Sequence, residues 1–203
     1  MSCKLQASRE KLYIWVYNNY SAPCNLQLIA HGSWLEACSL RLAAYLCPMK
    51  ILIVCLGNIC RSPMAEGILQ DMANKADLNW TVDSAGTNAC HIGEAPHPFS
   101  IKVAGLNGID ISRQRARRFI KEDMMEYDRI FAMAEDVLED IKKIAKDKFD
   151  EQKVDLFLNE LHAGCNEDVP DPWYGPEEGY HEVFEIINKT CKKIMNKYAV
   201  SIV

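Results

Sequence analysis

The feature that most constrains the fold is an apolar run, Lys50-Ile-Leu-Ile-Val-Cys55, that leads directly into a short loop containing Gly57. Unbroken β-branched and aliphatic residues over this length predict a strand buried on both faces, as strands of parallel sheets are. After the loop, Ser62-Pro63 combines a helix N-cap with a proline at the first helical position, which predicts a helix that continues to about Ala73. A buried strand followed at once by a helix is the basic unit of an α/β fold.

Strand and helix patterns continue to alternate toward the C-terminus. We predict strands at residues 80–84, 129–133 and 153–157, and helices at residues 99–106, 135–145 and 177–198. This alternation predicts an α/β domain of three layers, in which helices cover both faces of a central, mostly four-stranded parallel sheet. Ligands of such folds bind at the carboxyl ends of the strands. The last helix places its apolar residues on one face: Tyr180, Val183, Phe184, Ile187, Cys191, Ile194 and Tyr198.

The chain divides at Pro48-Met49. Residues 1–48 show no regular hydrophobic period, and turn-forming residues interrupt each of their short apolar runs. We predict that they form an extension without a catalytic role, for which a disordered segment, a docking or regulatory segment, and one short helix over residues 33–47 remain alternatives. Residues 49–203 are predicted to form one catalytic domain.

Composition excludes several classes of protein. Hydrophobic residues at 49% and charged residues at 25% are ordinary for a globular chain. A net charge of −5 argues against a nucleic-acid partner. The apolar stretches are far shorter than the roughly 18 residues that span a bilayer, and no secretory signal is found, so we expect no membrane association. Nine cysteines, an odd number, fit free thiols in a reducing compartment, and we expect the protein to be cytoplasmic.

The loop after the first strand carries a cysteine and an arginine, Cys55 and Arg61, separated by five residues. A loop that curls around an anion can turn its backbone N–H groups inward, and the following helix adds the positive end of its dipole. This field favours the thiolate of Cys55 as a nucleophile, while the planar guanidinium of Arg61 can hold two phosphate oxygens. Gly57 allows close approach of the backbone, and Ser62 can donate a hydrogen bond to the thiolate. The pattern predicts a phosphate-binding loop.

The stretch Val54-Cys-Leu-Gly-Asn-Ile-Cys-Arg-Ser-Pro-Met-Ala-Glu66 resembles the signature of the low-molecular-weight protein tyrosine phosphatases, and the resemblance extends from Met49 to near the C-terminus. It implies hydrolysis of aryl phosphate monoesters through a phosphocysteine intermediate on Cys55, with phosphotyrosine proteins or small aryl phosphates as substrates. We expect no metal and no cofactor, and a monomer or weak dimer. The loop residues expected to bind the phosphate are Leu56, Gly57, Asn58, Ile59, Cys60, Arg61 and Ser62.

A carboxylic acid must protonate the leaving group, and the segment from Val169 to Gly175 supplies Asp171 between two prolines. The prolines hold the segment extended, and Trp173 and Tyr174 follow as a wall for a flat substrate. From the residues alone, an Asp-Pro pair is usually a turn. Similarity to the family's Asp-Pro-aromatic-aromatic-Gly segment identifies Asp171 as the general acid, which later deprotonates the hydrolytic water.

Three more residues are expected to support the loop or protect it. Asn58 requires a tight, left-handed backbone conformation, which asparagine tolerates better than most residues. Ser84 lies in a segment that resembles the one whose serine contacts this asparagine in the family, although an ordinary strand-end turn is the alternative. Cys60 could form a reversible disulfide that protects Cys55 from over-oxidation, or it could be inert.

Three departures from the family pattern concern specificity rather than chemistry. Cys90-His91 stands where the family commonly has an aromatic residue at the pocket rim, so we expect one open wall there. His97 and Ala134 replace frequent aspartates, and we expect altered loop packing at both positions.

Three other functions remain alternatives. A protein arginine phosphatase typically has a threonine before the second cysteine of the loop, where this chain has Ile59. An arsenate reductase of the same fold needs a cysteine pair near the third strand, and none occurs between Cys90 and Cys165. A catalytically silent phosphoprotein-binding module would not need Cys55, Asp171 and the arginine together.

Overall fold

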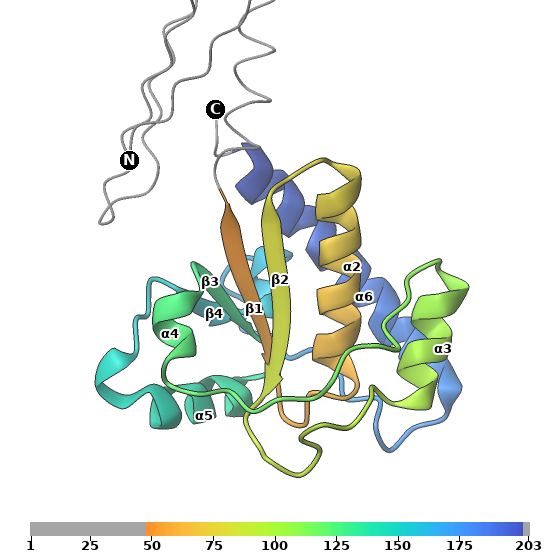
Figure 1. Ribbon diagram of the computed structural model, residues 1–203, viewed down its shortest axis with the longest axis horizontal. Coiled ribbons are helices and arrows are strands. Elements are labelled where there is room, and N and C mark those ends of the chain that lie inside the picture. The colour runs from red at the N-terminus through yellow and green to blue at the C-terminus, as the bar shows by residue number, and fades with distance from the viewer. Residues whose placement is uncertain (1–47, 201–203) are drawn as a thin grey trace, which may run out of the picture.

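Four parallel strands form the central sheet of the computed structural model, which describes residues 48–200 (Figure 1). The strand order is β2-β1-β3-β4, and each neighbouring pair is parallel, which confirms the predicted sheet. Apart from Pro48, the predicted N-terminal extension, with its candidate helix over residues 33–47, lies outside the described residues. The strands are β1 (Met49–Cys55), β2 (Trp80–Gly86), β3 (Arg129–Ala132) and β4 (Val154–Leu156).

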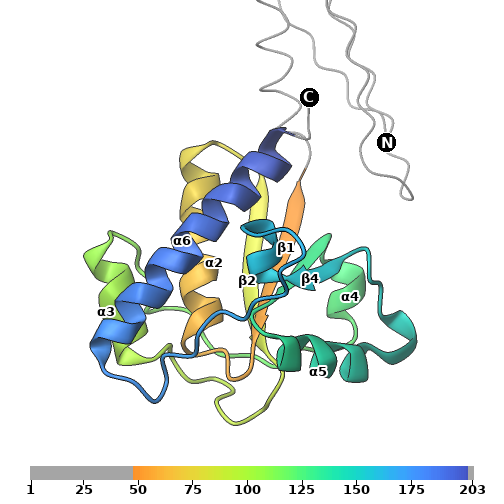
Figure 2. The ribbon, with the colours of Figure 1, turned by 180° about the vertical axis from the view of Figure 1, so that it is seen from behind.

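Helices cover both faces of the sheet, as predicted (Figures 1 and 2). The helices are α2 (Arg61–Lys75), α3 (Pro98–Leu106), α4 (Asp123–Glu126), α5 (Glu135–Ala145) and α6 (Glu177–Val200). Helices α2 and α6 pack against one face and α3 packs on both of them, whereas α4 and α5 lie at the other face. Two 3₁₀ turns, η1 (Lys146–Lys148) and η2 (Phe157–Glu160), lie on either side of β4 in the sequence.

The position of β1 between β2 and β3 explains its unbroken apolar sequence. Ile51 and Ile53 lie in the core that α2 and α6 form, whereas Leu52 and Val54 lie in the core that α5 forms. All four side chains are fully buried, and each such burial contributes about 1.5–3 kcal/mol. The strand is therefore held from both faces, which fixes the position of Cys55 at its end.

One predicted helix boundary is wrong. Ser62 is not the N-cap of α2, because the helix begins at Arg61, and Cys60 occupies the cap position without a side-chain cap bond. The Ser62 hydroxyl instead contacts the Cys55 sulfur and the side-chain amide of Asn58. These contacts within the loop take the place of a capping hydrogen bond from the Ser62 hydroxyl. The short helix α4 and both 3₁₀ turns are additional to the predicted elements, because three or four residues show no periodicity.

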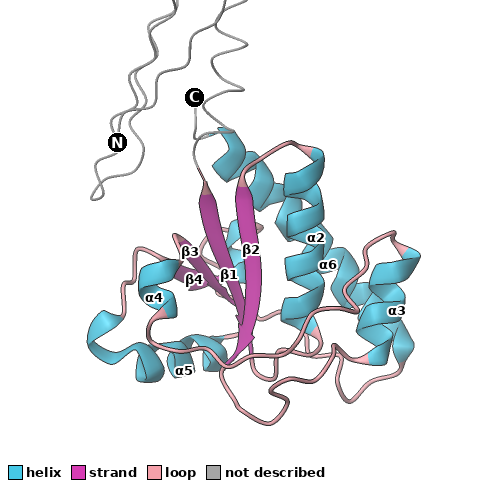
Figure 3. Ribbon diagram, in the orientation of Figure 1, coloured by secondary structure: helices cyan, strands magenta, loops and turns pink. Residues whose placement is uncertain are grey.

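The carboxyl ends of the strands and the loops that follow them lie at one edge of the sheet (Figure 3). At the opposite end of the domain, the chain enters β1 at Met49 and leaves α6 at Val200 (Figures 1 and 2). Within residues 48–200, no helix combines the length and the apolar character needed to cross a membrane.

Candidate active site

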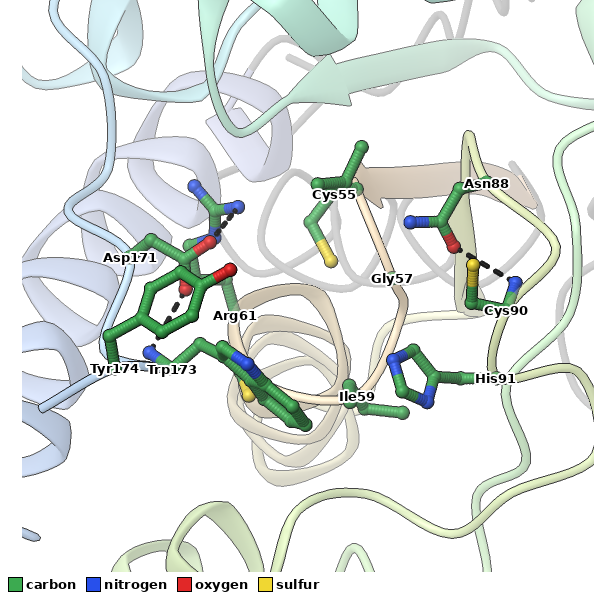
Figure 4. A pocket seen from close by; sticks show the side chains of 12 residues that line it. Cys55, Gly57, Ile59, Arg61, Asn88, Cys90, His91, Asp171, Trp173 and Tyr174 are labelled. Atoms are coloured by element: carbon green, nitrogen blue, oxygen red, sulfur yellow. Dashed lines mark hydrogen bonds and ion pairs between the residues drawn. The ribbon is translucent and has the colours of Figure 1, made fainter.

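A pocket of about 210 Å³ opens at the carboxyl edge of the sheet, around the loop between β1 and α2. Figure 4 shows the Cys55 sulfur pointing into this pocket, with Trp173 and Tyr174 on one side and Asn88, Cys90 and His91 on the other. The pocket brings together these residues predicted from the sequence: Cys55, Leu56, Gly57, Ile59, Cys60, Arg61, Asp171, Trp173 and Tyr174. The other three, Asn58, Ser62 and Ser84, are buried and do not line the pocket.

The Cys55 side chain lies at the end of β1 with only 2% of its surface exposed. Its sulfur is 3.0 Å from the Ser62 hydroxyl oxygen, and the backbone N–H of Asn58 donates to it at 3.2 Å. The loop therefore holds the sulfur between a hydroxyl and an amide. A sulfur in this arrangement can face an anion bound within the same loop.

Asn58 connects the loop to the structure behind it. Its φ of 56° is the left-handed conformation predicted from the sequence. Its amide nitrogen donates to the Ser62 hydroxyl at 2.9 Å and to the Ser84 hydroxyl at 2.8 Å, which confirms Ser84 as its partner. Its carbonyl oxygen accepts from the backbone N–H of Arg117 at 2.9 Å, and the Ser84 hydroxyl donates onward to Glu66 at 2.6 Å. All polar atoms of the Asn58 side chain are thus used.

The Arg61 guanidinium joins the loop to the segment that carries Asp171. One terminal nitrogen donates to the carbonyl oxygen of Val169 at 3.1 Å, and the other donates to an Asp171 carboxylate oxygen at 2.8 Å. The Arg61 side chain is 8% exposed and that of Asp171 41%, so the carboxylate borders the open part of the pocket. The other Asp171 oxygen accepts from the backbone N–H of Trp173 at 3.1 Å. A bound anion would meet both the guanidinium and this carboxyl group.

Aromatic rings build the rim of the pocket. The His91 ring lies 5.6 Å from that of Trp173, so the wall that we expected to be open is lined by His91 and its neighbour Cys90. His97 is stacked on Tyr180 at 5.1 Å and also lies 5.4 Å from Trp173. Burial lowers the pKa of His97, which favours the neutral ring in this stack. His97 thus packs against both Trp173 and Tyr180.

Cys60 lies inside the loop, where its sulfur is 3.6 Å from the hydroxyl of Tyr180. Burial raises the pKa of the Cys60 thiol to about 11, so this sulfur is protonated at neutral pH. Cys55 and Cys60 are both free thiols. The redox role of Cys60 remains a prediction.

Sequence reasoning missed several residues of the site. Asn88 lines the pocket beside Cys90 and His91, which the sequence had placed at the rim, and a usable signal for Asn88 was its position directly after β2, at the carboxyl edge of the sheet. Glu66 is the last residue of the motif quoted above, but the sequence assigns it no function. Its burial and its contact with Ser84 arise only from packing in the folded chain. No sequence signal indicates that the backbone amide of Arg117 contacts the loop.

Comparisons with known proteins agree with this geometry. The family model described as low molecular weight phosphotyrosine protein phosphatase matches residues 50–201. A protein of that name from Schizosaccharomyces pombe is 38% identical over 139 residues, which cover 67% of this chain and 88% of the relative. The crystal structure of YfkJ from Bacillus subtilis is similar with a TM-score of 0.69 and 33% identity, over 75% of this chain and 96% of that one. The structure of Wzb from Vibrio vulnificus, in complex with benzylphosphonate, is similar with a TM-score of 0.66 and 30% identity, over 73% of this chain and 98% of that one.

Proposed function

The chain belongs to the low molecular weight phosphotyrosine protein phosphatase family, and on this premise we propose that it hydrolyses phosphotyrosine in proteins and related aryl phosphate monoesters. The observation that carries the proposal is the meeting of three groups at one pocket. The Cys55 sulfur lies within the loop, the Arg61 guanidinium borders it, and the Asp171 carboxyl group is 2.8 Å from that guanidinium.

In the first step, the Cys55 thiolate attacks phosphorus, so that an S–P bond forms as the P–O bond to the leaving group breaks. Asp171, protonated, gives its proton to the leaving phenolate oxygen. The loop amides and the Arg61 guanidinium hold the phosphoryl oxygens, on which charge is spread in the transition state. Ser62 donates to the sulfur and stabilises it as an anion. The product of this step is a phosphocysteine and a free phenol.

In the second step, water attacks the phosphocysteine and the S–P bond breaks. Asp171, now a carboxylate, accepts a proton from the attacking water. Cys55 leaves as a thiolate, again with the Ser62 hydroxyl 3.0 Å from its sulfur. Inorganic phosphate is released and both side chains return to their initial states. Neither step needs a metal ion or a cofactor.

The rim supports an aromatic substrate. Trp173 and Tyr174 are 40% and 95% exposed beside the loop, and aromatic side chains offer flat apolar surface to a phenyl ring. Ile59, also in the lining, keeps that part of the pocket apolar. These contacts favour phosphotyrosine over phosphoarginine, whose guanidino group needs polar partners. Comparison of turnover on matched phosphotyrosine and phosphoarginine peptides separates the two activities.

Two finer assignments complete the proposal. The free thiols of Cys55 and Cys60 suit a reducing compartment, and we assign the protein to the cytoplasm on this ground. Under mild oxidation, Cys60 would form a disulfide with Cys55 that thiol reductants reverse.

The substitution Cys55→Ser tests the function directly. We expect it to abolish turnover of p-nitrophenyl phosphate and of a phosphotyrosine peptide, because a serine hydroxyl is a far weaker nucleophile than a thiolate. Vanadate should still bind, since the loop amides and Arg61 remain, and this is measured by calorimetry. Cys165→Ser, at an exposed free cysteine, is the matched control and should retain full activity. Turnover by Cys55→Ser near the wild-type rate would refute the proposed function.

A further inference from the structure

A continuous series of hydrogen bonds links Glu66, a carboxyl group outside the pocket, to the Cys55 sulfur. Glu66 lies on α2, four residues after Ser62. Its carboxylate accepts from Ser84 at 2.6 Å, Ser84 accepts from the Asn58 amide at 2.8 Å, and the same amide donates to Ser62 at 2.9 Å. Ser62 then meets the sulfur at 3.0 Å. Every contact in the series is within hydrogen-bond distance.

The donor direction along this series is set by one backbone amide. The N–H of Arg117 can only donate, so the Asn58 oxygen that it contacts must be the acceptor, and the Asn58 nitrogen must be the donor in both of its contacts. Ser62 and Ser84 each accept one of these bonds. Each hydroxyl therefore has its own hydrogen left for its remaining partner: the Cys55 sulfur for Ser62, and Glu66 for Ser84.

We propose that Glu66 is a positioning residue of the phosphatase: its carboxylate holds Ser84 as a donor and, through Asn58, keeps the Ser62 hydroxyl directed at the Cys55 sulfur. The proposal rests on the proposed function of Cys55. A proton on the Glu66 oxygen that faces Ser84 would turn this acceptor into a donor. The Ser84 hydrogen would then lose its acceptor, and the hold on the Asn58 amide would weaken. A hydrogen bond to a carboxylate is also about twice as strong as one to a neutral group.

The surroundings of Glu66 make its charge state dependent on pH near neutrality. Desolvation by burial raises the pKa of Glu66 to about 7 from 4.5, and the hydrogen bond from Ser84 opposes this only in part. The other groups that face it are Asp83 of β2 and, from the segment between α3 and α4, Gln114 and Arg117. Asp83 raises its pKa, whereas Gln114 and Arg117 lower it. Glu66 is thus mostly ionised only above neutral pH.

This pKa has a consequence for stability that distinguishes positioning from a structural role. Because the pKa is raised on folding, the native state binds more protons than the unfolded state between the two pKa values. The contribution of Glu66 to stability is therefore fully present below about pH 4.5 and is lost as the pH rises through about 7. The ionised carboxylate lowers stability in the pH range where we propose that it supports catalysis. If Glu66 had only a structural role, its ionisation would change stability and catalysis in the same direction.

The experiment compares Glu66→Gln with the wild-type full chain at several pH values, because glutamine keeps the shape of the side chain but cannot ionise. The ratio of wild-type to variant kcat/KM on p-nitrophenyl phosphate cancels the ionisations that both proteins share. We expect this ratio to be near 1 at about pH 5.5 and to rise to about tenfold at about pH 8. The melting temperature of the variant, relative to the wild type, should rise over the same range. A ratio that does not change with pH overturns the proposal.

Ser84→Ala provides a second test, and its pH profile does not depend on the folding of Glu66→Gln. It breaks the series of hydrogen bonds between Glu66 and Asn58. The ratio of wild-type kcat/KM to that of Ser84→Ala should therefore also rise with pH. In the Ser84→Ala background, Glu66→Gln should change kcat/KM by less than about twofold, and independent, additive effects would overturn the proposal. Asp71→Asn, at a partly exposed carboxylate on the same helix that pairs with Lys75, is the matched control and should give a ratio near 1 at every pH. A wild-type chain without aryl phosphatase activity would instead refute the proposed function itself.

Discussion

Arg61 has two roles in the geometry, because the same guanidinium reaches the anion-binding loop and the segment that holds Asp171. Its two terminal nitrogens donate to the Val169 carbonyl oxygen and to the Asp171 carboxylate. A phosphate entering the pocket would share the guanidinium with the carboxyl group. The charge of the substrate and the position of the general acid are therefore coupled through one side chain.

We predict that Arg61→Lys lowers kcat on p-nitrophenyl phosphate by about 100- to 1,000-fold, because lysine keeps the charge but loses the planar pair of donors. Steady-state kinetics measures the loss. Arg118→Lys, at an exposed arginine, is the control and should keep wild-type kcat. A loss below about tenfold for Arg61→Lys would mean that charge alone is sufficient at this position.

At the scale of single residues, the sequence was most informative where a motif is contiguous. Cys55, Arg61 and the left-handed Asn58 lie within seven residues, and their relation follows from the loop itself. Asp171 required the family resemblance, because more than one hundred residues separate it from the loop. The contact between Ser84 and Glu66 was not predictable, since it depends on the packing of α2 against β2.

At the scale of elements, helix boundaries deviate from prediction where a side chain has a competing use. Ser62 has the sequence context of an N-cap, yet its hydroxyl is directed at the Cys55 sulfur. Strand β2 continues two residues beyond its predicted end, because its pairing with β1 extends to the Cys55 and Gly86 positions. Sequence patterns indicate the tendency of a segment to form a helix or a strand. Tertiary packing determines which groups pair with a strand end or a helix cap.

The N-terminus of α5 shows how one loop replaces a missing cap. Ala134 precedes this helix and has no side chain that could cap it, but the Asp168 carboxylate accepts from the backbone N–H of Glu135 at 2.8 Å. The next residue, Val169, donates to the Met133 carbonyl at 2.8 Å. The segment that leads to Asp171 is therefore fastened to the start of α5.

We predict that Asp168→Ala lowers the free energy of unfolding by about 1 kcal/mol, the usual effect of removing a helix cap. The same change should lower kcat several-fold, because the segment that presents Asp171 loses an anchor. Chemical denaturation and steady-state kinetics measure the two effects. Glu167→Ala, at the adjacent exposed carboxylate, serves as the control. If Asp168→Ala lost stability but kept full kcat, the cap would not contribute to placing Asp171.

At the scale of the whole molecule, the alternation of strands and helices was sufficient to predict the layered α/β architecture. The order β2-β1-β3-β4 was not predicted, because a periodic pattern identifies a strand but not its neighbours. Once β1 is central, its two apolar faces are explained, since α2 and α6 cover one side and α5 covers the other.

We predict that a shortened chain beginning at Met49 folds and keeps its activity. Among residues 48–200, those that follow Pro48 already build two hydrophobic cores and line the pocket. The value of kcat/KM should stay within about tenfold of the full chain, which corresponds to roughly 1.4 kcal/mol. Kinetics and melting curves under reducing conditions provide the comparison. A larger loss of activity would show that residues 1–48 contribute to the site, and a large fall in melting temperature would show that they belong to the core.

The placement of Met49 and Val200 at the end of the domain opposite to the pocket has a practical consequence (Figures 1 and 2). A resin, a bead or a fluorescent reporter coupled at the end of α6, or at Met49 of the shortened chain, would be attached on the side remote from the Cys55 loop. The mouth of the pocket would then face away from the support and remain open to a bulky phosphoprotein. An immobilised enzyme made in this way should process large and small aryl phosphates with the same relative preference as the free enzyme.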